Sequence, residues 1–110
     1  MKQGEIWYAD LNPTKGREQA GLRPVLIVSG NLLNEHLPIV IIMPLTTKIK
    51  NYKGNPILTP SKSSGLKTDS EVLVFHVRSV SKERLVRKLG SIGKSDLDRS
   101  VKTLNDILTF

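Results

Sequence analysis

The side chains that could carry chemistry are few in this chain, which has 110 residues and no cysteine. Without cysteine the chain offers no thiol nucleophile, disulfide or zinc–thiolate site. Its two histidines, His36 and His76, could perform acid–base chemistry. His36 lies in a loop before Pro38 and has no partner motif, so we expect it at the surface. His76 falls in a predicted strand beside Arg78, where it serves either such chemistry or a backbone hydrogen bond.

Arg23 is a candidate phosphate ligand, because it stands where a polar segment meets an apolar run, in the sequence EQAGLRP at residues 18–24. A guanidinium suits a phosphate, since it offers paired donors and stays charged. Pro24 fixes its own φ and makes the start of the apolar run rigid. From the residues alone, Arg23 either binds phosphate or forms a structural salt bridge with Glu18.

Thr46 occupies a similar boundary, in the sequence PLTTK at residues 44–48. Its hydroxyl could donate to a phosphate oxygen or relay a proton, but turn chemistry and β-propensity explain most threonines in such places. Asp69 and Glu71 lie close together, yet no third metal ligand follows at a useful spacing. A phosphate-binding glycine loop is also missing. We therefore expect no metal and no other cofactor.

The net charge of +7 is concentrated in the middle of the chain. Residues 45–94 hold eleven basic and three acidic side chains, whereas residues 1–44 are neutral overall and residues 95–110 carry a net charge of −1. Such a block suits a polyanion, because Lys and Arg displace counterions from phosphates, although a solubilising surface would look the same. The N-terminus lacks the apolar segment of a signal peptide, and no apolar run spans a bilayer. We expect a cytoplasmic protein with no membrane association.

Apolar patterning predicts a chain of short strands that ends in one helix. The expected strands are residues 5–10, 23–29, 39–44, 55–59, 71–77 and 88–92, and short helical turns are expected within 30–37 and 81–85. Polar loops fill residues 11–22, 46–54 and 60–68. Ser95 begins an amphipathic helix over residues 95–108, whose apolar positions repeat at helical spacing. This order predicts a mainly β fold, in which one helix packs on a small, strongly bent sheet or partial barrel.

Two blocks of sequence resemble MazF/PemK-type toxins, and a third resembles them more weakly. The first block runs through residues 4–7, 10–16, 18–21 and 23–25, and the second is PLTT at residues 44–47. The third contains RSV at residues 78–80 with Lys82 and Arg84, and the terminal amphipathic helix also matches. The similarity therefore covers nearly the whole chain, with residues 1–110 as a single toxin domain.

This resemblance implies an SH3-like partial barrel that forms a homodimer and cleaves single-stranded RNA selectively without metal. It also implies inhibition by an acidic antitoxin protein. By the same resemblance, Arg23 and Thr46 are the catalytic pair, and Glu18 and Gln19 shape the site. The 2′-OH of the RNA would attack the phosphate, so that the products carry a 2′,3′-cyclic phosphate and a 5′-OH.

The chain departs from this family where many relatives carry an acid followed by Gln. Phe75 and His76 occupy those positions here, so the group that removes the 2′ proton is open between Glu18 and His76. Lysine-rich stretches at 48–53 and 62–67 would follow the RNA backbone, with Tyr52 and Phe75 as stacking platforms. The residues expected to bind RNA are Thr47, Lys48, Lys50, Tyr52, Lys53 and Arg78.

Two other functions are compatible with the sequence. One is a non-catalytic RNA-binding module, in which Arg23→Ala would weaken binding with no turnover to lose. The other is a toxin of the same fold that inhibits a topoisomerase by binding it, since a fold does not determine a function. A pure inhibitor of that kind needs neither Arg23 nor Thr46 at the barrel mouth.

Overall fold

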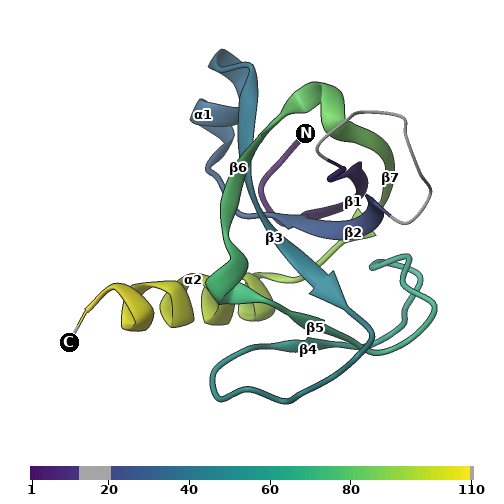
Figure 1. Ribbon diagram of the computed structural model, residues 1–110, viewed down its shortest axis with the longest axis vertical. Coiled ribbons are helices and arrows are strands. Elements are labelled where there is room, and N and C mark those ends of the chain that lie inside the picture. The colour runs from purple at the N-terminus through teal and green to yellow at the C-terminus, as the bar shows by residue number, and fades with distance from the viewer. Residues whose placement is uncertain (13–20, 110) are drawn as a thin grey trace.

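The computed structural model describes residues 1–12 and 21–109 as a strongly bent sheet with a helix at one end (Figure 1). The strands are β1 (Glu5–Asp10), β2 (Leu22–Ile27), β3 (Ile39–Thr46), β4 (Ile57–Leu58), β5 (Ser70–Val72), β6 (Arg78–Ser81) and β7 (Leu85–Ser91). The α-helices are α1 (Asn31–His36) and α2 (Lys94–Leu108), and two short 3₁₀ helices are η2 (Val74–His76) and η3 (Lys82–Arg84). No helix in this described part of the chain is long and apolar enough to cross a bilayer.

Strand β3 connects the two halves of the fold. The sheet order is β4-β5-β3-β2-β1-β7, and β6 pairs with β3 outside this path. The first half of β3 pairs with β6, its middle pairs with β2, and Leu45 and Thr46 at its end pair with β5, all antiparallel. The fold is mainly β with a C-terminal helix, which confirms the predicted partial barrel.

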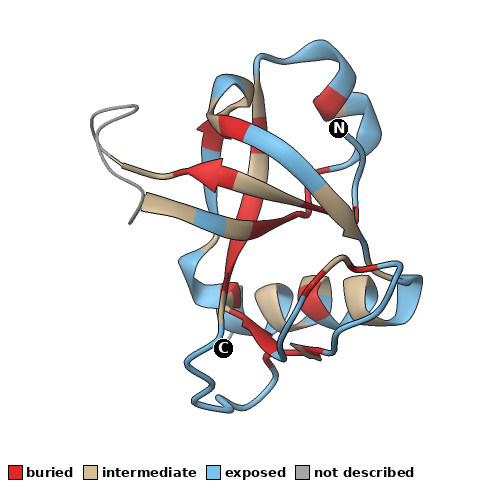
Figure 2. Ribbon diagram, turned by 90° about the vertical axis from the view of Figure 1, so that its right-hand side faces the viewer, coloured by how far each residue is buried: buried red, intermediate tan, exposed pale blue. Residues whose placement is uncertain are grey.

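Strands β2 and β3 are buried on both faces, which explains their continuous apolar sequences. Val25 and Ile42 belong to a core cluster on one side of the sheet. Leu26 and Met43 belong to a second cluster on the other side, against which α2 packs. Figure 2 shows this as buried segments along the crossing strands, between exposed loops. The short strands near the ends of the sheet therefore attach to a rigid centre.

Helix α2 packs on the sheet by a narrower apolar face than its sequence predicts. Leu97 and Leu104 pack against the core, but Leu108 at the end of the helix is 71% exposed. The helix begins at Lys94, one residue before the predicted start at Ser95; its N-cap is Gly93, and no side-chain hydrogen bond caps it. Asp98, three residues after Ser95, instead pairs with Lys94 at 3.0 Å.

The predicted strand at 71–77 was wrong in its second half, because the register with β3 leaves three residues over. Val72 pairs with Leu45, and Arg78 pairs with Ile42. From Val72 to Arg78 the chain advances six residues, whereas its partner β3 covers the same span in three, from Leu45 to Ile42. The surplus forms the 3₁₀ helix η2, closed by a hydrogen bond from the His76 N–H to the Leu73 carbonyl (3.0 Å).

Other boundaries differ from prediction at the strand ends. The predicted strand 55–59 shortens to β4, and the predicted strand 88–92 begins three residues earlier as β7. The strand predicted at 23–29 ends at Ile27 as β2, and that predicted at 39–44 continues to Thr46 as β3. The turns predicted within 30–37 and 81–85 are confirmed as α1 and η3. These differences matter to function mainly at η2, which borders the site.

Candidate active site

Arg23 stands near the beginning of β2, where the sheet opens to solvent. It pairs with Ala9 of β1, a fully buried residue, so its backbone is held in the sheet. Its side chain is exposed and borders two neighbouring hollows of the surface. A fixed backbone with a free guanidinium is the arrangement needed to hold a phosphate that arrives from solution.

The first hollow, here called the Thr46 hollow, measures about 300 Å³. Its lining includes Leu22, Arg23, Thr46, Thr47, Lys48 and Ser70. Thr46 is the last residue of β3, and its Oγ1 accepts a hydrogen bond from the Lys48 N–H at 3.1 Å. No hydrogen bond from this hydroxyl to another described residue accompanies that contact, so its proton can be donated to a ligand. The structure thus brings Arg23 and Thr46, which are distant in sequence, to one hollow.

The second hollow, the His76 hollow, measures about 440 Å³. Its lining includes Leu11, Arg23, Pro44, Leu73, His76 and Arg78. Arg23 is the lining residue that both hollows share, so its side chain lies between them, and the two hollows together are called the groove here. His76 reaches this groove from the end of η2, and not from a strand as the sequence predicted. An imidazole and a second guanidinium therefore lie on one side of Arg23, and a hydroxyl lies on the other.

An exposed row of rings continues outward from His76. The rings of Phe75 and His76 meet edge to face with centroids 4.6 Å apart, and those of Tyr52 and Phe75 meet likewise at 5.5 Å. Tyr52 is 50% exposed and Phe75 is 48% exposed. Rings in such contact present π-faces on which unpaired bases stack. The turn at η2 creates this row by placing Phe75 and His76 outside the sheet.

The loop of residues 47–56, here called the basic loop, carries most of the other residues predicted to bind RNA. Thr47 and Lys48 line the Thr46 hollow. Lys50, Tyr52 and Lys53 are exposed on the same loop, but they line neither hollow described above. They lie where they would meet the parts of a ligand that extend beyond the groove.

Glu71 of β5 holds the basic loop from inside, a role that was not predicted from the sequence. Its side chain is completely buried. Oε1 accepts hydrogen bonds from the N–H groups of Lys50 (2.8 Å) and Asn51 (2.9 Å). Oε2 accepts from the Tyr52 N–H (2.9 Å) and the Asn55 side-chain amide (3.0 Å). Successive backbone N–H groups that converge on one anion form a nest, here completed by a positive φ of 57° at Asn51.

These contacts decide the charge of Glu71. Burial raises the pKa of its carboxyl, but the hydrogen bonds from Asn55 and from the loop N–H groups lower the pKa further than burial raises it. The carboxylate is therefore ionised at neutral pH and serves as the anchor of the basic loop. The sequence suggested only an incomplete metal site for Asp69 and Glu71. Within residues 1–12 and 21–109, no three His, Asp or Glu side chains gather to hold a metal.

Arg84 holds the beginning of the first long loop. Its Nη1 donates to the backbone carbonyls of Asp10 (3.0 Å) and Asn12. The two described ends of that loop meet through a hydrogen bond from the Leu11 N–H to the Gly21 carbonyl (3.0 Å). Glu18 and Gln19, predicted to shape the site, lie outside the described residues, as does the alternative salt bridge of Arg23 with Glu18.

The chain that forms this groove is similar to a known family of proteins. The sequence profile of the PemK-like, MazF-like toxins of type II toxin–antitoxin systems matches residues 2–108. The chain therefore belongs to this family.

Similarity to individual members runs over nearly their full length. The chain is 33% identical over 109 residues to an endoribonuclease MazF from Staphylococcus saprophyticus, covering 98% of this chain and 88% of that protein. It is 31% identical over 100 residues to endoribonuclease EndoA from Bacillus subtilis, covering 90% and 86%. The fold matches that of a mycobacterial endoribonuclease solved with its cognate antitoxin, with a TM-score of 0.79, 24% identity and coverage of 98% and 94%.

Proposed function

We propose that the protein is an endoribonuclease toxin, with residues 1–110 as one toxin domain, that cleaves single-stranded RNA in the groove joining Arg23 and Thr46. The observation that carries the proposal is the position of Arg23 at the junction of two hollows, with a hydroxyl on one side and an imidazole on the other. Relatives that match most of the chain are named endoribonucleases, which supports the same class of reaction.

Arg23 binds the scissile phosphate in this mechanism. Its guanidinium stabilises the charge that grows on the phosphate oxygens, and Thr46 donates a hydrogen bond to the same phosphate. The RNA supplies the nucleophile, so the protein needs only to align the 2′ oxygen with phosphorus and to move protons. The 2′ oxygen bonds to phosphorus while the bond to the 5′ oxygen breaks, giving a 2′,3′-cyclic phosphate and a 5′-OH.

Proton transfer falls to His76 or Glu18. A base removes the 2′ proton and an acid protonates the departing 5′ oxygen, which together contribute about two to four orders of magnitude in rate. Of the two candidates only His76 belongs to the described residues, and it lines the same hollow as Arg23. Two variants, His76→Ala and Glu18→Ala, distinguish the candidates. The pH dependence of kcat should change in the variant that lacks the residue that transfers the proton.

The basic loop and its neighbours bind the strand on either side of the cut. Thr47 and Lys48 contact the RNA backbone beside Thr46, Arg78 does so beside His76, and the exposed Lys50 and Lys53 lie further along the strand. Tyr52 stacks on a base, supported by its contact with Phe75. Single strands fit such a groove better than duplexes, because their bases are free to stack and to be read.

Two partner proposals accompany the enzyme. An acidic antitoxin protein neutralises it, a pairing supported by the solved complex of a protein of the same fold and by the excess positive charge at the groove. A second copy of the chain forms a homodimer that covers exposed apolar side chains such as Leu32. Sedimentation equilibrium tests the dimer: a monomer at micromolar concentration would contradict it.

One experiment tests the function directly. The protein is incubated with a long single-stranded RNA in excess chelator, and the ends of the products are mapped. Cuts at defined sites that carry a 2′,3′-cyclic phosphate are expected from the wild type. Arg23→Ala should lose them, whereas Arg99→Ala on the exposed face of α2 should cut normally.

A matched substrate completes the test. A strand with a single 2′-deoxyribose at the cut position should bind but resist cleavage, because its nucleophile is missing. Cleavage of that strand would exclude the mechanism. Binding without cleavage of any RNA would favour a non-catalytic RNA-binding module, and absence of RNA binding would favour an inhibitor of a protein target such as a topoisomerase.

A further inference from the structure

A third hollow adjoins the Thr46 hollow and shares no lining residue with the His76 hollow. It measures about 220 Å³ and shares Pro24, Thr47 and Ser70 with the Thr46 hollow. Two cations, Lys67 and Arg87, belong to its lining. This Arg87 hollow was not expected from the sequence, in which Arg87 carried no motif.

Arg87 is fixed by its place in the sheet. Tyr8 of β1 pairs with Arg87 of β7 on one side and with Pro24 of β2 on the other. The three residues therefore form a row across three strands, about 10 Å from end to end at the usual strand spacing. The Arg87 guanidinium lies 5.1 Å from the centre of the Tyr8 ring, a cation–π contact that orients it.

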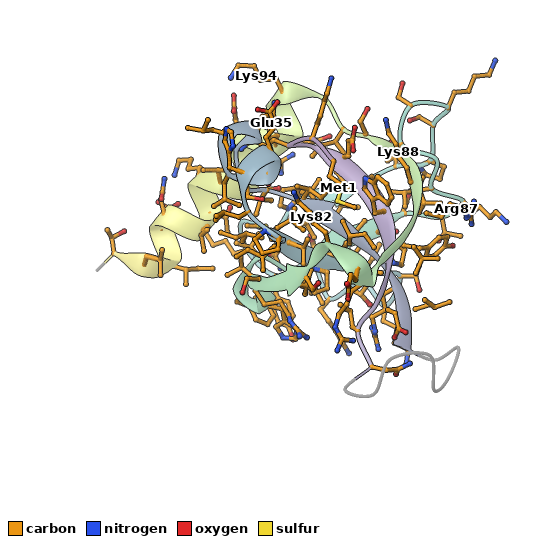
Figure 3. The ribbon with its side chains drawn as sticks, turned by 90° about the horizontal axis from the view of Figure 1, so that it is seen from above. Met1, Glu35, Lys82, Arg87, Lys88 and Lys94 are labelled. Carbon is orange, nitrogen blue, oxygen red and sulfur yellow. The ribbon has the colours of Figure 1, made fainter. Side chains whose placement is uncertain are left out.

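Arg87 differs from its neighbour in the strand in how its charge is paired among the described residues. The next residue, Lys88, forms an ion pair with Glu5 at 3.1 Å. Among the described residues no carboxylate pairs with Arg87 or with Lys67. Figure 3 shows the labelled Arg87 and Lys88 on the side of the molecule where β7 adjoins the loop that carries Lys67. Of these two neighbouring residues, Lys88 thus pairs with a carboxylate of the protein, and Arg87 pairs with none of the described ones.

Lys67 is brought beside Arg87 by close contact between backbones. The loop of residues 59–69, here called the serine loop, lies directly on β7, with a hydrogen bond from the Ser91 N–H to the Ser63 carbonyl (2.8 Å). Gly65 has a φ of +71°, and a Cβ there would lie 2.1 Å from the Leu89 carbonyl oxygen. Only glycine permits this approach.

We infer that the Arg87 hollow binds a second phosphate of the RNA strand, next to but distinct from the scissile phosphate. Two cations that pair with no carboxylate in residues 1–12 and 21–109, together with the hydroxyl of Thr47, are suited to a phosphodiester anion, since they supply both charge and directional donors. The hollow adjoins the Thr46 hollow through shared lining residues, so a strand held by Arg23 can extend into it. The inference rests on the ribonuclease function proposed above and adds a contact that sets the direction of the strand in the groove.

A double-mutant cycle between one side chain and one phosphate tests this assignment. RNA strands that carry the 2′-deoxy block at the cut position receive a neutral methylphosphonate at one flanking position at a time. Dissociation constants are measured by fluorescence anisotropy for the wild type and for Arg87→Gln, which keeps most of the side-chain length and removes the charge. Lys67→Gln serves as a second variant, and Arg99→Gln serves as a control with the same change in net charge.

For the wild type, one flanking methylphosphonate should weaken binding by about fivefold, the upper range for an exposed charge pair. In Arg87→Gln the same strand should bind no more weakly than its all-phosphate parent, and in Arg99→Gln the fivefold loss should persist. The position of the sensitive phosphate, 5′ or 3′ of the cut, gives the direction of the strand.

Equal losses in the wild type and in Arg87→Gln at every position would overturn the inference. So would unchanged RNA binding by Arg87→Gln together with weaker inhibition by an acidic antitoxin, because the hollow would then belong to the protein partner. Cleavage of the all-ribose strand is measured in parallel. Cleavage without coupling would contradict only the second phosphate site. Coupling without cleavage would contradict the nuclease function and would still support the phosphate site.

Discussion

The basic loop and the serine loop border the same groove, yet different physical devices hold them. The basic loop surrounds a buried carboxylate, Glu71, which accepts four hydrogen bonds from it. The serine loop lies on β7 through backbone contacts that Gly65 and Gly90 make possible. Within it, the buried Ser64 accepts hydrogen bonds from the N–H groups of Ser61 (3.2 Å) and Leu66 (3.2 Å).

Because their anchors differ, the two loops should respond to different changes in pH and in sequence. A loop anchored by an ion responds to pH and to the loss of a single charge, because its hydrogen bonds depend on that charge. A loop anchored by close backbone contact responds instead to added volume, because a packed interface accommodates extra atoms poorly. A change in one anchor should therefore leave the other loop in place.

The largest effect is expected from Gly90→Ala, which breaks the anchor of the serine loop. A Cβ at Gly90 would lie 2.1 Å from the Ser63 carbonyl oxygen, so the loop or β7 must move. We expect the free energy of unfolding, measured by urea denaturation, to fall by at least about 3 kcal/mol. The control is Gly30→Ala, where an added Cβ meets nothing within 4 Å and the cost should stay below about 1 kcal/mol. Equal stability of the two variants would contradict the close contact.

The second largest effect is expected from Glu71→Gln, which keeps the shape of the basic loop's anchor. A glutamine amide has one acceptor oxygen, so two of the four donors would face its NH₂ group. We expect a loss of about 2 to 3 kcal/mol in the free energy of unfolding and weaker RNA binding. Glu35→Gln, at an exposed position of α1 labelled in Figure 3, removes the same charge and should do neither. A fully stable Glu71→Gln variant would show that the carboxylate is not the anchor.

Acid should loosen the basic loop while the serine loop stays in place. The pKa of Glu71 is lowered by its hydrogen bonds, despite burial. Burial also raises the pKa of Glu5. The contacts with Trp7, Lys2 and Lys88 outweigh burial and lower this pKa from 4.5 to about 2. Depressed pKa values contribute stability that is present above the unfolded value and is lost as pH falls toward the folded value.

For Glu5 this window runs from about pH 4.5 down to about pH 2. Stability at pH 3 should therefore be lower than at pH 7 by roughly 2 kcal/mol from Glu5, with a further loss from Glu71. As the pH falls, the protection of backbone N–H groups from hydrogen exchange, relative to their intrinsic rates at each pH, should decrease first at residues 50–52. The Glu71→Gln variant should lose less stability over this range than the wild type; an identical pH profile would argue against the role of Glu71.

The smallest effect is expected from Lys48→Ala, which removes one cation of the basic loop and neither anchor. For single-stranded nucleic acid, each lost phosphate contact reduces the slope of log K against log salt concentration by about 0.7. We expect this change in slope, with little change in stability. Lys102→Ala on α2 should leave the slope as it is, since that side chain pairs with Asp106 (2.8 Å) and lies outside the groove. An unchanged slope in Lys48→Ala would exclude this contact.

Much of the central fold was predictable from local pattern. Strand β1 was predicted with its observed bounds, and the terminal helix was misplaced by one residue at its start. These segments have a clear period or a continuous apolar run, because one or both of their faces are buried. The pattern failed at residues 73–77, where the apolar sequence reads as a strand although the register with β3 forces a turn.

The candidate site was predictable in part. Arg23 and Thr46 stand at boundaries between core strands and polar loops, and a boundary of that kind is visible in the sequence. The roles of Glu71 and Arg87 were not, because each depends on a partner that is distant along the chain. A glutamate that anchors residues 50–52 looks, in sequence, like any other glutamate near a strand.

By itself, the sequence determined which side chains leave the core and with what chemistry: a guanidinium before Pro24, a hydroxyl at the end of an apolar run and a surplus of cations between residues 45 and 94. Only the tertiary structure decided which of them share a groove. Strand register places Tyr8 between Pro24 and Arg87, and the register of β3 turns His76 outward to the hollow that Arg23 borders. Local propensity acts over a few residues, whereas register and backbone contact join segments separated by dozens, so the groove exists only once the sheet has closed.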